Sequence, residues 1–239
     1  MNPAERIIVA ADVSTSVELA HLARTLAPLG VLFKIGLEAI TSLGGARAIN
    51  DIQEYGGRVF YDGKFADIPN TVAKSSAYLA GLNVAMFNVH ASCGWDSLDA
   101  AVANRGDAKV LAVTVLTSLD DYLVGEIFGD TSKNKVLQFA TRAYLHGCDG
   151  IICSPQELPF LMEDAHAKKL LKVTPGVRPE WAPANDQKRI MTPGDAIKAG
   201  ADYLVIGRPI TSPPDGMNPV EAAQRIAEEI KEALSGTQE

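Results

Sequence analysis

The feature that most constrains the fold is an alternation, from end to end, of short apolar runs rich in β-branched residues with longer amphipathic stretches. We count eight of each. Strands are expected at residues 6–12, 31–36, 58–64, 84–91, 109–117, 149–154, 171–176 and 203–208. Helices are expected at residues 15–28, 37–55, 69–81, 95–104, 133–146, 155–167, 192–199 and 218–235. Repeated strand–helix units build a parallel sheet, and eight of them predict an α/β fold of the (β/α)8 TIM-barrel class.

An open, doubly wound sheet shows the same alternation, so periodicity alone leaves it as an alternative. No G-x-G-x-x-G follows the first apolar run, which disfavours a dinucleotide-binding version. Gly63-Lys64 is similar to the end of a phosphate-binding P-loop, but Phe65 replaces the Ser or Thr, and the glycine five positions earlier is missing. A length of 239 residues suits one barrel, so residues 1–239 are expected to form a single domain.

Composition and charge exclude several classes of function. A formal net charge of −7 disfavours binding to nucleic acid, which needs clustered cations. No apolar run has the length of a membrane span, and the N-terminal residues lack the pattern of a secretion signal, so a soluble, cytoplasmic protein without membrane contact is expected. Cys93, Cys148 and Cys153 form no C-x-x-C pair, and neither they nor the four histidines have zinc-site spacing. Free thiols are therefore expected, and no metal.

Charged residues gather where the expected strands end. Asp12 ends the first strand, Lys34 lies late in the second, Asp62 and Lys64 end the third, and Asp67 follows in the next loop. In a TIM barrel the carboxyl ends of the strands and their loops build the active site, so these side chains are candidates for catalysis.

The spacing of Asp62 and Lys64 should place both side chains on one side of their strand, with Tyr61 and Gly63 on the other. An isolated Asp-x-Lys is more often an exposed ion pair. Here the apolar residues before the pair suggest a buried strand, and Lys34 reaches the equivalent end of the neighbouring strand. The functional interpretation is therefore favoured.

Alternating ammonium and carboxylate groups suit a decarboxylation that uses no cofactor. Each charge is offset by a neighbour of opposite sign. A substrate carboxylate placed against Asp62 would be repelled, and the repulsion would disappear as CO₂ leaves. The remaining carbanion would be stabilised by an ammonium group already in place, and Lys64 could deliver the proton.

The string Asp62-Gly-Lys-Phe-Ala-Asp-Ile-Pro-Asn-Thr71 resembles the D-x-K-x-x-D-I-P-N-T signature of the orotidine 5′-monophosphate decarboxylases. The D-x-K-x-x-D part is shared with related sugar-phosphate decarboxylases and hexulose-phosphate synthases, and the I-P-N-T part points to the orotidine enzymes. Other segments resemble the same family in order, so the resemblance covers nearly the whole chain. They are Asp12 with its preceding strand, Phe33-Lys34-Ile-Gly36, Asn88-Val-His-Ala91, Val113–Ser118, Val173–Arg178, Asp186-Gln187 and Gly207-Arg208-Pro-Ile210.

The resemblance implies decarboxylation of orotidine 5′-monophosphate to UMP, without cofactor or metal, in a homodimer with shared sites. Lys34, Asp62, Lys64 and Asp67 would form the catalytic array. The remaining assignments concern substrate binding: Asp12 and Thr71 with the ribose, Thr117 and Ser118 with the base, Arg178, Gln187, Gly207 and Arg208 with the phosphate, and Ile68 without a more specific role. Asp67 and Thr71 would reach into the partner subunit's site.

The phosphate assignment also has a physical basis, because loops after strands 7 and 8 of a TIM barrel often bind phosphate. An arginine fork matches phosphate geometry. Arg178 and Gln187 lie in a proline-rich connection of about fifteen residues, which is long for a barrel and suggests a lid. Three positions depart from the family pattern. Gly63, Ala66 and Cys93 stand where relatives commonly carry Leu, His and Gly.

Three other functions stay open at this stage. A Schiff-base aldolase would use a barrel lysine as nucleophile, although neighbouring carboxylates favour the protonated amine. A sugar-phosphate decarboxylase or hexulose-phosphate synthase would need Mg²⁺. A barrel that only binds a nucleotide has no evident need for a cluster of like and unlike charges.

Overall fold

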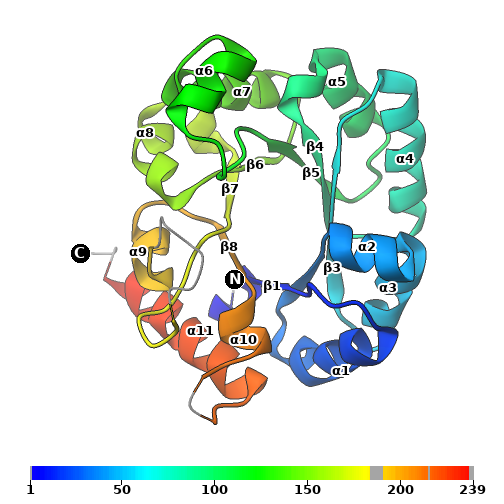
Figure 1. The fold of residues 1–239 in the computed structure, drawn as a ribbon, viewed down its shortest axis with the longest axis vertical. Helices are drawn as coiled ribbons and strands as arrows, with labels where there is room; N and C mark the ends of the chain where they lie inside the picture. The colour runs from blue at the N-terminus through cyan, green and yellow to red at the C-terminus, as the bar shows by residue number, and fades with distance from the viewer. Residues whose placement is uncertain (1, 184–190, 215, 237–239) are drawn as a thin grey trace. The chain divides into compact units, whose positions relative to one another are not determined.

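The computed structural model describes residues 2–183, 191–214 and 216–236 (Figure 1). Within these residues, eight strands follow one another in chain order, and the sheet is a closed barrel. The strands are β1 (Ile7–Ala10), β2 (Leu32–Ile35), β3 (Arg58–Phe65), β4 (Met86–His90), β5 (Lys109–Val113), β6 (Gly150–Ile152), β7 (Leu171–Thr174) and β8 (Tyr203–Ile206). Each strand falls within or beside its expected range, and the topology confirms the (β/α)8 TIM-barrel class over an open sheet.

Helices follow the strands as expected, with short 3₁₀ turns between some of them. They are α1 (Ser16–Leu26), α2 (Leu37–Leu43), α3 (Gly45–Gln53), α4 (Pro69–Gly81), α5 (Trp95–Ala103), α6 (Asp121–Phe128), α7 (Ser132–Leu145), α8 (Leu158–Glu163), α9 (Pro193–Lys198), α10 (Arg208–Thr211) and α11 (Pro219–Ser235). Side chains open several of them. Thr15, Thr131 and Thr192 each accept a hydrogen bond from a backbone N–H in the first turn of α1, α7 and α9.

The contacts of the chain divide it into two compact units, which we call the terminal unit (Met1–Gly63 and Thr174–Glu239) and the central unit (Lys64–Val173). In the terminal unit, β1 pairs in parallel with β8 and β2, and β2 pairs with β3. Strands β1, β2 and β8 have four residues each, and all of these residues are buried, as expected for parallel strands covered by helices. Helix α11 packs against α9 and α1, and α1 packs against α3.

In the central unit, β4 pairs in parallel with β5, β5 with β6 and β6 with β7. Helix α4 packs against α5, and α7 packs against β5 and β6. Each unit carries its own buried apolar side chains, among them Phe33 and Ile49 in the terminal unit and Phe87 and Leu111 in the central unit. The expectation of a single domain over residues 1–239 stays a prediction.

The helices differ from the expectation in four places. The helix expected at 155–167 is the shorter α8, Leu158–Glu163, which a 3₁₀ turn at Pro155–Glu157 precedes. The helix expected at 37–55 is interrupted at Gly44, whose φ of 84° is incompatible with a right-handed helix. Helix α6 was not expected, and Val124 is its one buried residue. The single turn of α10 follows β8 directly, where the sequence gives no helical period.

None of the helices in the described part of the chain is long and apolar enough to cross a bilayer. The three cysteines are free thiols, as expected. Burial raises the pKa of Cys148 to about 12, so this thiol stays protonated and inert at neutral pH.

Candidate active site

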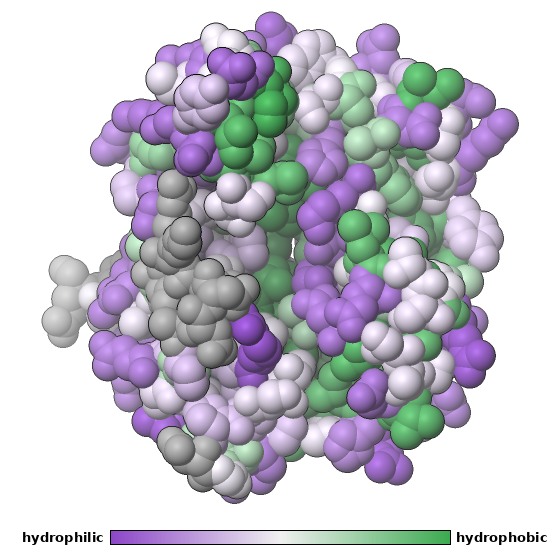
Figure 2. Space-filling view, viewed as in Figure 1, coloured by the Kyte–Doolittle hydropathy of each residue, from purple (hydrophilic) through white to green (hydrophobic). Residues whose placement is uncertain are grey.

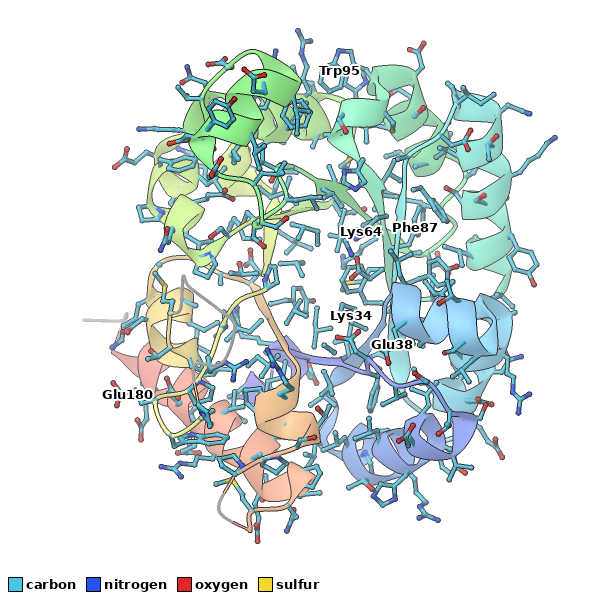
Figure 3. The ribbon with its side chains drawn as sticks, viewed as in Figure 1. Lys34, Glu38, Lys64, Phe87, Trp95 and Glu180 are labelled. Carbon is cyan, nitrogen blue, oxygen red and sulfur yellow. The ribbon has the colours of Figure 1, made fainter. Side chains whose placement is uncertain are left out.

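The centre of the terminal unit's site is a lysine held between two carboxylates. The Lys34 ammonium lies 2.9 Å from Asp12 Oδ1 and 3.4 Å from Asp62 Oδ2. The side chains of Lys34 and Asp62 are each 11% exposed, whereas that of Asp12 is half-exposed. The structure brings these three predicted residues together, and their roles in the reaction stay predictions (Figure 3, where Lys34 is labelled).

Strand register explains why these three side chains meet. Lys34 pairs with Ala10 of β1 and with Phe60 of β3. Asp12 and Asp62 each come two residues later, and side chains two residues apart on a strand share a face. The long lysine side chain reaches both carboxylates. Tyr61 points away from this group and toward α3. A Cβ added to Gly45 of α3 would lie 2.9 Å from the Tyr61 hydroxyl oxygen.

Gly36 is part of this arrangement, and sequence reasoning gave it no role. A Cβ at Gly36 would lie 2.7 Å from Lys34 Nζ, 3.3 Å from Asp12 Oδ1 and 3.8 Å from Asp62 Oδ2. Its φ of −97° is open to any residue, so the constraint is space and not backbone conformation. The one sequence feature that could have indicated this role is the position of Gly36 directly after the strand that carries Lys34.

Replacing Gly36 with alanine is expected to lower turnover roughly 100-fold, because displacing catalytic groups by about 1 Å has effects of this size. The added methyl group pushes the flexible end of Lys34 and leaves the backbone in place, so thermal stability should change little. Gly81→Ala is the matched control, because no atom lies within 4 Å of a Cβ there. Steady-state kinetics of both variants test this, and near-normal turnover of Gly36→Ala would remove the steric argument.

A cavity of about 250 Å³ in the terminal unit connects the charged residues with the expected phosphate site. Its lining includes Asp12, Lys34, Arg178, Gly207 and Arg208. Arg208 is exposed, and Gly207 precedes it at the end of β8. These residues are far apart in the sequence, so their meeting in one cavity supports the phosphate assignment.

Arg178 lines the cavity and also donates hydrogen bonds to two backbone carbonyls of the protein. It is 4% exposed, its guanidinium donates to the Pro183 carbonyl, and its backbone N–H donates to the Met191 carbonyl over 3.0 Å. Gln187 and the neighbouring Asp186, which the resemblance assigns to phosphate, lie outside the described residues. The expected lid falls largely on the same stretch and stays a prediction.

Lys64 and Asp67 belong to the central unit. Lys64 has a φ of 48°, so the backbone is not extended at this residue, and the expectation that Lys64 and Asp62 share one side of the strand stays a prediction. Its backbone N–H donates to Asn88 Oδ1 over 2.8 Å. Asp67 is exposed, and its Oδ1 accepts a hydrogen bond from the Ile68 N–H over 2.7 Å.

The remaining substrate-binding candidates in the central unit are all exposed. Ile68 is 65% exposed, and Thr71 lies in the first turn of α4. Thr117 and Ser118 lie in the connection between β5 and α6. Their roles toward ribose and base stay predictions.

Over residues 2–183, 191–214 and 216–236, no three His, Cys, Asp or Glu side chains are grouped as metal ligands. The expectation that no metal takes part stays a prediction.

Comparison with known proteins identifies the family. The model of the orotidine 5′-phosphate decarboxylase / HUMPS family matches residues 5–226. Orotidine 5′-phosphate decarboxylase of Geotalea daltonii is 45% identical over 94% of this chain and 95% of its own, and that of Moorella thermoacetica is 44% identical over 97% and 94%. The crystal structure of orotidine 5′-phosphate decarboxylase from Lactobacillus acidophilus has a TM-score of 0.82 and 32% identity over 95% of this chain and 99% of its own. The chain belongs to the orotidine 5′-phosphate decarboxylase / HUMPS family.

Proposed function

We propose that this chain decarboxylates orotidine 5′-monophosphate to UMP and CO₂, the last step of de novo pyrimidine synthesis. The observation that carries the proposal is the array of Asp12 with the buried Lys34 and Asp62 at the carboxyl ends of β1, β2 and β3. The relatives from Geotalea daltonii and Moorella thermoacetica, which match nearly the whole chain, are orotidine 5′-phosphate decarboxylases. Nothing in the array favours the aldolase or the hexulose-phosphate synthase.

Asp62 supplies the driving force in this mechanism. The Asp62 carboxylate lies 3.4 Å from the Lys34 ammonium, and its side chain is 11% exposed. A substrate carboxylate next to Asp62 raises the energy of the bound substrate, and the repulsion is relieved as the carbon–carbon bond breaks and CO₂ departs. Because this relief develops toward the transition state, it accelerates the reaction and not only binding.

Lys64 completes the reaction by acting on the carbon that carried the carboxylate. The electron pair of the broken bond stays on that carbon, and the ammonium stabilises the charge before donating its proton. The products are UMP, CO₂ and a neutral lysine, which regains a proton from solvent. No electron-accepting cofactor enters this scheme.

The phosphate is bound away from the reacting carbon by Arg208 and the Gly207 backbone, with Arg178 and Gln187 as further contacts. Arg208 is exposed at the cavity that Asp12 and Lys34 also line. Binding energy from the phosphate holds the substrate carboxylate against Asp62, a use of remote contacts that raises turnover.

We also propose a cytoplasmic homodimer with two shared sites, in which Asp67, Ile68 and Thr71 act in the partner's site. Residues 67–71 are all exposed in the single chain. Ile68 is 65% exposed, and apolar side chains of α6 reach the surface, with Leu123 41% and Ile127 57% exposed (Figure 2). Exposed apolar side chains of this kind are typical of surfaces that bind another protein.

The test is a spectrophotometric assay of the pure protein with orotidine 5′-monophosphate, with and without EDTA. Turnover to UMP that is insensitive to EDTA is expected. Unphosphorylated orotidine should be turned over far more slowly, because it lacks the contacts to Arg208. Loss of activity in EDTA would favour the Mg²⁺-dependent hexulose-phosphate synthases, and equal use of orotidine would contradict the phosphate site.

A further inference from the structure

The backbone of Lys64 has a conformation that lysine rarely adopts. Its φ of 48° lies in the left-handed region, where Cβ crowds the following carbonyl. Among the described residues, one other non-glycine residue has a positive φ, Asn83, and asparagine tolerates this region far better than lysine. A strained backbone at a candidate catalytic lysine persists only where its surroundings hold it.

The buried side chain of Asn88, on the next strand, forms a hydrogen bond with the backbone of Lys64. Asn88 Oδ1 accepts the Lys64 N–H over 2.8 Å. Asn88 is 1% exposed and lies in the middle of β4, where it pairs with Leu111 of β5. The neighbouring residues Phe87 and Val89 are fully buried. A carboxamide at such a place is costly unless it is hydrogen-bonded, so its presence calls for a specific purpose.

A second contact fixes the same two segments. The ring of Phe65, next to Lys64, lies 6.0 Å from the ring of Phe87, next to Asn88 (Figure 3, where Lys64 and Phe87 are labelled). The end of β3 is thus attached to β4 at two consecutive residues, once by a hydrogen bond and once by aromatic packing.

We infer that Asn88 is a positioning residue for the decarboxylation, and that its carboxamide holds Lys64 in the left-handed conformation that aims the ammonium at the reacting carbon. The direction of a Cα–Cβ bond follows from the backbone angles. If φ returned to an ordinary negative value, the start of the lysine side chain would swing away. The inference rests on the proposed role of Lys64 as the proton donor.

The experiment compares Asn88→Ala with the unchanged protein by two measurements. Without the acceptor, kcat should fall on the order of 10- to 100-fold with KM changed less than about threefold, because misplacing a catalytic group slows chemistry and leaves uniform binding intact. Hydrogen exchange followed by NMR should show faster exchange of the Lys64 amide. Asn104→Ala is the matched control, because it removes an amide-to-backbone bond of 2.8 Å, to the Ala100 carbonyl, in the same unit.

Asn88→Asp provides the conservative variant, since it keeps an acceptor oxygen for the Lys64 N–H. It should retain a slowly exchanging Lys64 amide and most of the kcat, and it stays informative if Asn88→Ala does not fold. Normal kcat in Asn88→Ala overturns the inference. So does a large loss of kcat in either variant with unchanged exchange of the Lys64 amide. If the unchanged protein fails to turn over orotidine 5′-monophosphate, the proposed function is wrong, and the exchange data still decide whether Asn88 holds Lys64.

Discussion

Lys64→Ala should abolish measurable turnover, with a loss of at least about 1000-fold, while the affinity for UMP changes only a fewfold. The lysine is proposed to act on charge that develops as CO₂ leaves and then to donate the proton, so its contribution appears in the transition state and not in nucleotide binding. Alanine keeps a Cβ and a backbone N–H, so the bond to Asn88 Oδ1 can persist and the fold should be retained.

The matched control is Lys74→Ala, which removes an exposed lysine from α4 in the same unit. Turnover, UMP binding by calorimetry and thermal unfolding should be measured for both variants. A Lys64→Ala protein that keeps turnover within about tenfold of normal would exclude Lys64 as the proton donor, since general acid catalysis contributes more than this.

The fold followed from the sequence because one physical signal repeats along the chain. Buried parallel strands require continuous apolar runs, and the helices that cover them require an amphipathic period. The expected helices were wrong at some positions. Helix α6 buries only Val124, and α2 and α3 appear as one helix unless Gly44 is recognised as having a positive φ.

The charged residues of the site were also predictable, because Asp12, Lys34 and Asp62 follow from strand ends and a period of two. The sequence could not predict which neighbouring residues position these charged side chains. The role of Gly36 depends on a distance of 2.7 Å to Lys34 Nζ, and that of Asn88 on a contact across 24 residues. Neither has a local pattern. No local pattern shows that the backbone of Lys64 is left-handed either.

One of the departures from the family pattern now has a structural description. The thiol of Cys93, where relatives commonly carry glycine, donates to the His90 carbonyl over 2.8 Å, and burial raises its pKa. The Ser97 hydroxyl donates to the Asp67 carbonyl over 2.9 Å, which ties the start of α5 to the loop that carries Asp67.

Two inactive variants should restore activity to each other if Asp67 acts in the partner's site. In a two-fold dimer the exchange is reciprocal, so each site combines Lys64 of one subunit with Asp67 of the other. When Lys64→Ala and Asp67→Ala proteins are dissociated together and reassembled, a mixed dimer has both lesions in one site and none in the other. Random assembly makes half the dimers mixed, so roughly one quarter of all sites should be intact.

The matched control is a mixture of Lys64→Ala with Asp62→Ala. Asp62 and Lys64 are two residues apart on β3 and act in the same site in the proposed mechanism, so every site in such a mixed dimer should keep one lesion and activity should not return. Subunit exchange must be demonstrated separately, for example by native mass spectrometry of differently tagged chains. If exchange occurs and the Lys64→Ala and Asp67→Ala mixture stays inactive, Asp67 acts within its own chain, and its exposure in the single chain needs another explanation.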